Sequence, residues 1–287
     1  MTVSSRNISH KLPPESVEVL CDVVRHALRL EIPFFVLGAT ARDMIFGALY
    51  DIPVSRATFD IDLALRVADW KQYASLRTAL LHTQRYSEDR HHQQRLHHDN
   101  GSAIDLVPFG PVESPAGVIA WPPGNDIIMS TSGFEEALAS SIELIIAEDP
   151  ECTVRVCTPA ALAAMKIIAW HDNYPARTRD AQDLLFLMKE YLHVGNQERL
   201  YDTAADILSA AGFSLEVAGP RLLGRDIRQI VHADTRDKLF EILRRETADD
   251  SQFRLLSDMT RTTLRDDARL EEVLMLLRQL TMGLAQP

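Results

Sequence analysis

The stretch TFDIDLAL, residues 58–65, decides the fold. Apolar residues alternate with other residues along it, and this period of two predicts a β-strand. Side chains two positions apart point to the same face of a strand, so Asp60 and Asp62 project together while their apolar neighbours enter the core. Two carboxylates a few ångströms apart repel each other unless a cation lies between them. The stretch therefore predicts a divalent-cation site; the alternative for so short a motif is an edge strand with a solvated polar face.

A third carboxylate shifts the balance toward the cation site. Asp105 lies in a second predicted strand, 102–107, which forms a hairpin with residues 94–98 around an Asp-Asn-Gly turn at 99–101. If that strand pairs beside 58–65, Asp105 faces the same side as the first two carboxylates. Three converging carboxylates suit Mg²⁺, and two such ions support in-line phosphoryl transfer, with Asp105 orienting or deprotonating the attacking hydroxyl. Taken alone, Asp105 also fits an acid at a hairpin edge.

Upstream, the sequence VLGATARD, residues 36–43, has the pattern of a strand, a tight turn and the start of a helix. We predict the strand over 33–37 and the helix over 39–49. Helix N-termini bind phosphate through free N–H groups and the helix dipole. Thr40 adds a hydroxyl and Arg42 a positive charge, so the junction is a predicted phosphate contact. An ordinary strand–helix junction is the alternative.

A single lysine marks the helical half of the chain. Lys166 is the only lysine between Lys71 and Lys189, and its predicted helix, 160–171, is almost wholly apolar. Such a lysine either extends to solvent or meets an anion. The anion is a triphosphate or an aspartate, and phosphate is favoured. Further on, Arg179 and Asp183 stand one helical turn apart; they form an ion pair with each other, or Asp183 orients Lys166 or Arg179 toward a nucleotide.

Taken in chain order, four motifs resemble the nucleotidyltransferases of the AbiEii/type IV toxin group, within the DNA polymerase β-like superfamily. The motifs are Gly38-Ala-Thr-Ala-Arg42, Arg56-x-Thr-x-Asp60-Ile-Asp62-Leu63, Lys166, and Arg179-Asp180-x-x-Asp183-Leu184. The resemblance covers roughly residues 30–190. It implies a mixed-sheet core that transfers a nucleoside monophosphate from an NTP and releases pyrophosphate. In relatives the acceptor can be the 3′ end of tRNA.

The predicted site combines the resemblance with the carboxylate geometry. Mg²⁺ is expected on Asp60, Asp62 and Asp105, which together with Lys166 form the predicted catalytic set. The residues predicted to bind the nucleotide are Gly38, Ala39, Thr40, Arg42, Arg56, Lys166, Arg179 and Asp183. Ala39 departs from the Gly or Ser usual in the family, which moves direct phosphate contact to Thr40 or to backbone N–H groups. The acceptor stays open between tRNA, a small molecule and a protein hydroxyl, and a catalytically inactive nucleotide- or partner-binding protein is the further alternative.

The chain organisation predicts an α+β mixed-sheet core over 1–157 and a helical domain over 158–287 that completes the nucleotide site and binds the acceptor. The chain has 287 residues and a net charge of −11. Residues 1–219 carry 18 basic and 29 acidic side chains, whereas residues 220–287 carry 12 of each. The acidity excludes nucleic-acid binding by bulk attraction and leaves a local basic surface possible in the neutral tail.

The expected compartment follows from what the sequence lacks. Three cysteines without a CxxC motif favour a reducing compartment. There is no signal-peptide pattern and no apolar run of the ~18 residues that a membrane span needs. We expect a cytoplasmic protein, with an antitoxin as a partner if the toxin resemblance extends to function.

Several further expectations concern local structure. The adjacent pairs His91-His92 and His97-His98 cannot chelate well from a strand, and we expect all four histidines to be exposed. Residues 108–124 are rich in Pro and Gly and predict a loop, and 126–146 read as strand-like. Gly219-Pro220 predicts a break between helices.

Overall fold

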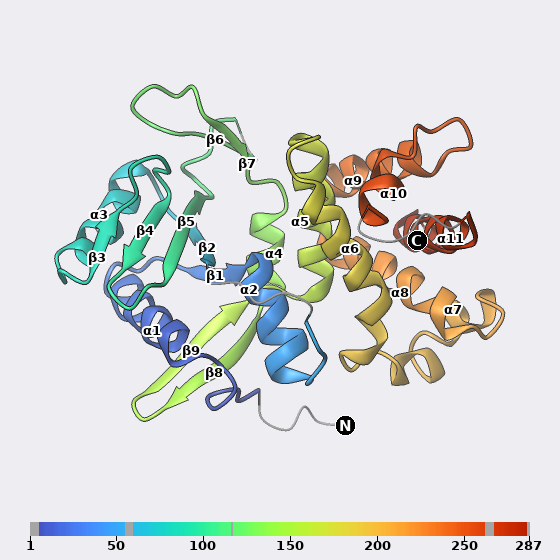
Figure 1. The fold of residues 1–287 in the computed structure, drawn as a ribbon, viewed down its shortest axis with the longest axis horizontal. Helices are drawn as coiled ribbons and strands as arrows, with labels where there is room; N and C mark the ends of the chain where they lie inside the picture. The colour runs from blue at the N-terminus through green and yellow to red at the C-terminus, as the bar shows by residue number, and fades with distance from the viewer. Residues whose placement is uncertain (1–5, 55–59, 116, 262–266, 286–287) are drawn as a thin grey trace. The chain divides into compact units, whose positions relative to one another are not determined.

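The computed structural model describes residues 6–54, 60–115, 117–261 and 267–285. The chain divides into two compact units, Met1–Thr158 and Pro159–Pro287, each with its own buried apolar residues (Figure 1). The first unit contains the sheets and the second is helical. The predicted α+β class with a mixed sheet is confirmed.

The strands all belong to the first unit. They are β1 (Phe34–Leu37), β2 (Asp60–Arg66), β3 (Tyr86–Glu88), β4 (Arg95–His98), β5 (Ala103–Phe109), β6 (Val118–Ala120), β7 (Ile128–Ser130), β8 (Ile142–Glu148) and β9 (Glu151–Val156). Its helices are α1 (Pro14–Arg29), α2 (Gly38–Arg42), a π-helix over Asp43–Leu49, α3 (Trp70–Leu81) and α4 (Phe134–Ala139).

The main sheet has seven strands in the order β3-β4-β5-β2-β1-β9-β8. The pairs β2–β5 and β1–β9 are parallel and the other neighbours are antiparallel. Behind the central strands the apolar positions of the alternating pattern are fully buried, with Ile61, Leu63, Ile104 and Leu106 at most 2% exposed. The period-two pattern of residues 58–65 thus produces one core face, as predicted for the part that the structure describes.

Two expectations for the first unit need correction. Residues 108–124 are not all loop, because Val118–Ala120 forms β6 and pairs with β7; three residues are too few to show an alternating pattern. The strand-like stretch 126–146 contains the helix α4 between β7 and β8.

The histidine prediction is right for three of the four residues. His91, His92 and His97 are exposed, but His98 is 4% exposed. Since adjacent residues on β4 face opposite sides, His98 must face the core when His97 faces solvent. Its Nε2 lies 3.9 Å from the Asp22 carboxylate of α1, which places α1 on the face opposite to His97.

The second unit consists of helices. They are α5 (Pro159–Asp172), α6 (Thr178–Glu190), two 3₁₀ turns over Tyr191–His193 and Glu198–Tyr201, α7 (Ala205–Ala210), α8 (Leu215–Ile230), α9 (Ala233–Thr247), α10 (Arg254–Met259) and α11 (Asp267–Ala285). Among the residues that the structure describes, none of the helices combines the length and apolar character needed to cross a membrane.

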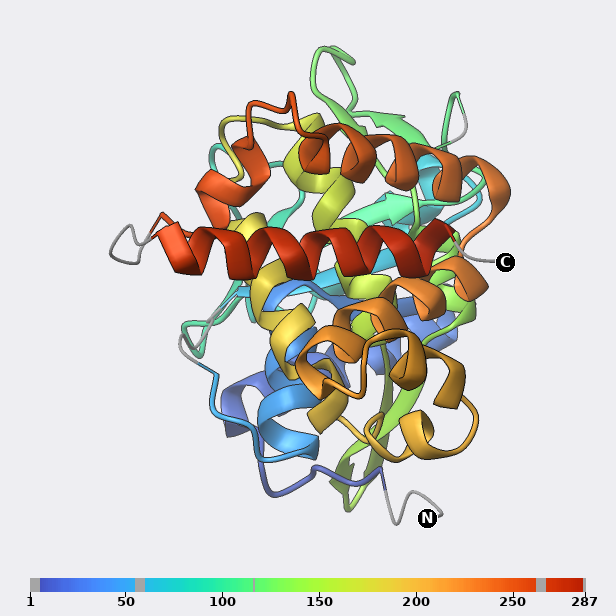
Figure 2. The same cartoon turned by 90° about the vertical axis from the view of Figure 1, so that its right-hand side faces the viewer.

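The helices α8 and α11 cross in close contact (α11 is the long red helix of Figure 2). A Cβ at Gly224 would lie 2.1 Å from the Leu280 carbonyl oxygen, and one at Gly283 would lie 2.0 Å from the Arg221 carbonyl oxygen. The two backbones therefore approach as only glycine allows. The break predicted at Gly219-Pro220 is wrong: α8 runs through Pro220, because this buried segment is held by packing that outweighs the missing N–H.

The crossing predicts effects of different size for two glycines of α8. Gly224→Ala should destabilise the protein by on the order of 2–3 kcal/mol, since the new methyl group meets backbone that cannot yield. Gly219→Ala is the matched control and should cost less, because its Cβ would meet the Leu192 side chain at 3.1 Å instead of backbone at 2.1 Å. Urea unfolding of both variants measures the difference; equal midpoints would contradict the assigned contact.

Candidate active site

The three carboxylates lie on two adjacent parallel strands. In the pairing of β2 with β5, Asp62 stands opposite Asp105 and Asp60 stands opposite Ala103. Since side chains at i and i+2 share a face, Asp60, Asp62 and Asp105 belong to one face of the sheet. The Asp105 side chain is 14% exposed and that of Asp60 is 48% exposed. The strand pairing expected from the sequence is therefore present, whereas the catalytic and metal roles of the three residues stay predictions.

A guanidinium group that the sequence reasoning missed lies between two of these carboxylates. Arg95 of β4 donates from Nε to Asp105 Oδ1 at 2.8 Å, and from Nη2 to Asp105 Oδ2 at 2.8 Å and to Asp60 Oδ2 at 3.1 Å. The hydrogen bonds to Asp105, more than any other contact, raise the pKa of Arg95 above its usual value. The register was the available signal, because the hairpin predicted around 99–101 sets Arg95 directly opposite Asp105.

These residues fit a hard divalent cation in their donor chemistry. All three offer carboxylate oxygens, which Mg²⁺ prefers. Among the described residues, no group of three or more His, Cys, Asp or Glu side chains is already arranged as a metal cage. Instead, the guanidinium of Arg95 supplies positive charge between Asp60 and Asp105, where a metal ion would supply it.

The glycine turn closes directly on this cluster. Gly38 has φ +67°, in the left-handed region, and a Cβ there would lie 2.0 Å from Asp62 Oδ2. Only glycine therefore lets the turn pack against the carboxylate. Thr40 is buried, and its Oγ1 donates to the backbone carbonyl of Asp60 at 2.9 Å. The turn therefore contacts β2 twice, by the close approach of Gly38 to Asp62 and by the hydrogen bond from Thr40 to Asp60.

The remaining residues predicted from this segment have other surroundings. Ala39 lies within α2, in a stretch that continues as a π-helix instead of the single α-helix expected over 39–49. Arg42 is buried and pairs with Asp43, with Nη2 to Oδ1 at 2.7 Å. Arg56, also predicted to bind the nucleotide, lies outside the described residues. Their nucleotide contacts remain predictions.

In the helical unit, Lys166 meets aspartates. Its Nζ donates to Asp180 Oδ1 at 2.7 Å and to Asp183 Oδ2 at 2.6 Å, and all three residues are buried. Burial favours the neutral amine, but the two carboxylates outweigh it and raise the pKa of Lys166. The aspartate contact considered for this lysine is therefore present, whereas the orientation of Lys166 or Arg179 toward a nucleotide by Asp183 stays a prediction. Arg179 is exposed. Contact of Lys166 and Arg179 with phosphate stays a prediction.

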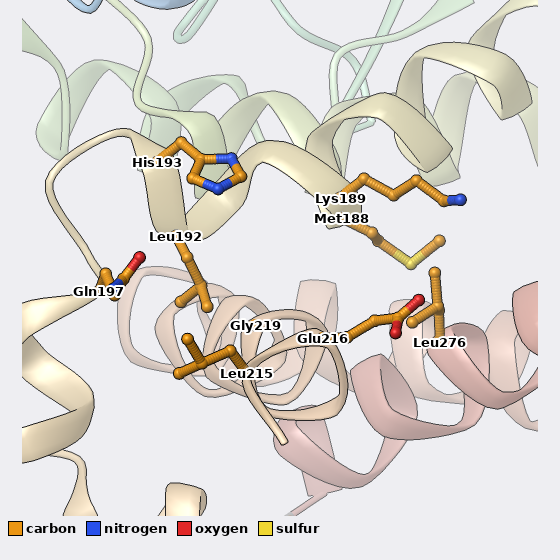
Figure 3. Close-up of a pocket in the computed structure, with 9 residues that line it drawn as sticks. All are labelled: Met188, Lys189, Leu192, His193, Gln197, Leu215, Glu216, Gly219 and Leu276. Carbon is orange, nitrogen blue, oxygen red and sulfur yellow. The ribbon is translucent and has the colours of Figure 1, made fainter. Parts of the chain in front are cut away.

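The helical unit also contains a pocket of about 300 Å³ (Figure 3). Leucine side chains from two segments, Leu192 and Leu215, point toward each other in it, and Glu216 points toward Leu276. Its lining residues are Met188, Lys189, Leu192, His193, Gln197, Leu215, Glu216, Gly219 and Leu276. The residues of this unit predicted to form the site, Lys166, Arg179 and Asp183, are not among the described residues that line this pocket.

The paired strands with three carboxylates and the glycine turn against Asp62 agree with the nucleotidyltransferase core that the sequence motifs imply. A family model described as "Nucleotidyl transferase AbiEii toxin, Type IV TA system" matches residues 25–274, and the chain belongs to this family. The resemblance carried by the sequence motifs is confirmed, and so is the prediction that the chain is a nucleotidyltransferase enzyme.

Two solved structures show a weak likeness to the chain. The solution structure of the antibiotic-resistance factor ANT(2'')-Ia is 14% identical, covers 69% of this chain and 97% of its own, and has a TM-score of 0.38. The Thermotoga maritima CCA-adding enzyme complexed with tRNA is 8% identical, covers 96% of this chain and 82% of its own, and has a TM-score of 0.26. Likeness at this level says nothing about the acceptor of this chain. No curated protein matches the chain significantly in sequence.

The buried lysine generates a stability prediction. Lys166→Met should cost about 3–5 kcal/mol, because Asp180 and Asp183 lose the cation buried between them. Asp180 keeps its second ion pair, with Arg177. Lys189→Met is the control, since the pair of Lys189 with Glu272 is about one-third exposed and should be worth less than about 1 kcal/mol. Chemical unfolding near neutral pH gives both values. A Lys166→Met variant as stable as the control would show that the two aspartates do not depend on the lysine.

Proposed function

We propose that this nucleotidyltransferase is Mg²⁺-dependent and moves a nucleoside monophosphate from an NTP to a hydroxyl acceptor, with the metal held by Asp60, Asp62 and Asp105. The observation that carries the proposal is the register of β2 against β5, which sets Asp62 opposite Asp105. All the proposed ligand atoms are hard oxygens. The positively charged guanidinium of Arg95 already lies between Asp60 and Asp105. When bound, the metal would supply charge neutralisation of the polyphosphate and of the attacking oxygen.

The reaction assigns distinct tasks to the residues of the chain. The acceptor oxygen forms a bond to the α-phosphorus, the bond from that phosphorus to the bridging oxygen of the β-phosphate breaks, and pyrophosphate leaves with the electron pair. Asp105 takes the acceptor proton, a role that suits a carboxylate fixed in mid-strand and shielded from solvent. Gly38, the backbone around Ala39 and Thr40, and the cations Arg42, Lys166 and Arg179 hold the triphosphate, with Asp183 positioning Lys166.

The acceptor proposed first is the 3′ end of tRNA, which the family resemblance implies. A small alcohol or a protein hydroxyl is the runner-up, and each gives a different labelled product. The family description places these enzymes in type IV toxin–antitoxin systems. We therefore propose a cognate antitoxin as a partner and the cytoplasm as the compartment. A protein without catalysis is disfavoured, because the three carboxylates are all present.

Activity of carboxylate variants tests this function. Incubation with Mg²⁺, each labelled NTP and bulk tRNA should label the RNA, and Asp60→Asn should reduce labelling to background. Asp105→Asn should reduce it by about 10²–10⁴, the usual contribution of general base catalysis. Asp126→Asn, at an exposed carboxylate of the same unit, is the control and should act as wild type. Full activity of Asp60→Asn would contradict the site, and absence of any labelled RNA, protein or small alcohol would contradict the activity.

Metal binding by an Arg95 variant tests the same site without turnover. A guanidinium and a divalent ion cannot occupy the same carboxylate oxygens, so Arg95→Gln should tighten Mn²⁺ binding in the absence of nucleotide by roughly tenfold, the effect of about 1.4 kcal/mol. Arg85→Gln removes an equal charge from a pair with Glu18 and Asp99 and should leave Mn²⁺ affinity unchanged. Electron paramagnetic resonance of free Mn²⁺ reports both. Weaker binding in Arg95→Gln would make Arg95 a support of the carboxylates instead of a competitor.

A further inference from the structure

A second cavity lies in the sheet-containing unit, beside the carboxylate strands. Its volume is about 450 Å³, within the range of small-ligand sites. The walls come from the outer face of α3, the end of β3 with the following turn, and the segment after β6. The residues that line it are Trp70, Tyr73, Ala74, Arg77, Thr78, Leu81, Glu88, Asp89, Gln93, Trp121 and Pro122. The segment after β6 belongs to the stretch 108–124, for which the sequence offered no function.

We call this second cavity the aromatic pocket, because three aromatic side chains form one of its walls. The rings of Trp70 and Tyr73 have centroids 5.6 Å apart, those of Trp70 and Trp121 are 5.4 Å apart, and those of Tyr73 and Trp121 are 5.8 Å apart. Tyr73 and Trp121 are about 5% exposed, whereas Trp70 is half-buried. Packing therefore fixes the cluster from behind and leaves part of the Trp70 side chain accessible.

The polar lining of the aromatic pocket contains the cation Arg77. Its guanidinium donates from Nη2 to Glu88 at 3.0 Å and lies 5.9 Å from the centroid of the Tyr73 ring. The Asp89 carboxylate is already occupied, since it accepts from His97 Nε2 at 2.8 Å and from the backbone N–H groups of His91 and His92. The lining therefore favours a ligand that brings hydrogen-bond acceptors to the Arg77 guanidinium, which has only donors.

The aromatic pocket is connected to the carboxylate strands by direct hydrogen bonds. The Tyr73 hydroxyl donates to the carbonyl of Leu106, the residue after Asp105, at 3.1 Å. The backbone N–H of Asp89 donates to the carbonyl of Arg95 at 3.3 Å. A ligand in the pocket would thus lie against Tyr73, which is bonded to the residue after the proposed general base, and against Asp89, which is bonded to Arg95.

We propose that this aromatic pocket binds a nucleobase. A base supplies both features that suit this lining: a flat π-face for the accessible tryptophan, and ring-nitrogen or carbonyl acceptors for the Arg77 guanidinium. A phosphate lacks the flat face, and the two carboxylates of the lining oppose it. The base comes either from the incoming NTP or from the end of an acceptor RNA. Naming these two sources rests on the proposed function, whereas binding of the base itself does not.

The tryptophans allow a direct test on the full chain. The chain has three, and two of them, Trp70 and Trp121, line the pocket, while Trp170 lies in the helical unit. Protein labelled with 5-fluorotryptophan should give three ¹⁹F signals, assigned by single Trp→Phe variants. Titration with the four nucleosides in EDTA should shift the Trp70 and Trp121 signals saturably and leave the Trp170 signal in place. Nucleosides lack phosphate and EDTA removes metal, so Asp60→Asn should give the same shifts.

Two variants and two further ligands define the outcomes. Trp70→Leu should weaken nucleoside binding by about tenfold or more, read from the Trp121 signal, and Arg77→Met should reduce the differences between the four nucleosides. Unchanged thermal midpoints establish that the variants are folded. A short RNA with a free 3′-OH and a non-hydrolysable NTP with Mg²⁺ identify the source of the base by which of them shifts both signals.

The proposal is overturned if millimolar nucleosides leave the Trp70 and Trp121 signals in place, or if a cationic amino sugar shifts them and nucleosides do not. Nucleoside binding by a protein that shows no transferase activity would support the pocket and contradict the proposed function alone.

Discussion

The parallel pairing of β2 with β5 is the constraint on which the rest of the sheet-containing unit depends. It sets Asp62 opposite Asp105 and keeps Asp60 on the same face. Like charges this close need a counter-charge. Arg95, one strand further on, supplies it through two hydrogen bonds to Asp105 and one to Asp60. The carboxylates are therefore gathered and neutralised by the architecture of the sheet.

Other features of the unit are arranged around this pairing. Gly38 is the residue that allows the preceding turn to lie against Asp62, and Thr40 ties the same turn to the backbone of Asp60. On the opposite face, Ile61 and Ile104 bury the strands in the core. An apolar face thus backs the three carboxylates, and the burial behind the strands offsets part of the cost of placing acids side by side.

Much of this arrangement could be predicted from the sequence, since it depends on local periodicity. The alternation around Asp60, the glycine after the first strand and the turn before Asp105 each have a short-range signal. Arg95 was missed because its role arises from cross-strand register, although the predicted hairpin contained that information. His98 was misread because four histidines were treated as one exposed group. Pro220 was misread because buried packing overrides the local preference of proline.

Contacts between residues distant in sequence explain what else the sequence could not show. The partners of Lys166 depend on how α6 packs on α5, and an apolar helix with one lysine fits an aspartate as well as a phosphate. The contact of the Trp121 ring with Trp70 of α3 depends on how the segment after β6 folds back, which no local pattern in the sequence shows. The family assignment over residues 25–274 extends well beyond the motifs that suggested it.

We propose that Asp60, Asp62 and Asp105 hold the metal ion of this nucleotidyltransferase. Anomalous diffraction from crystals grown with Mn²⁺ and a non-hydrolysable NTP locates that ion. We expect an Mn²⁺ peak in contact with oxygens of these carboxylates, with the Arg95 guanidinium displaced from Asp60 and Asp105. A bound nucleotide whose Mn²⁺ lies elsewhere, with Arg95 still hydrogen-bonded to both carboxylates, would contradict it.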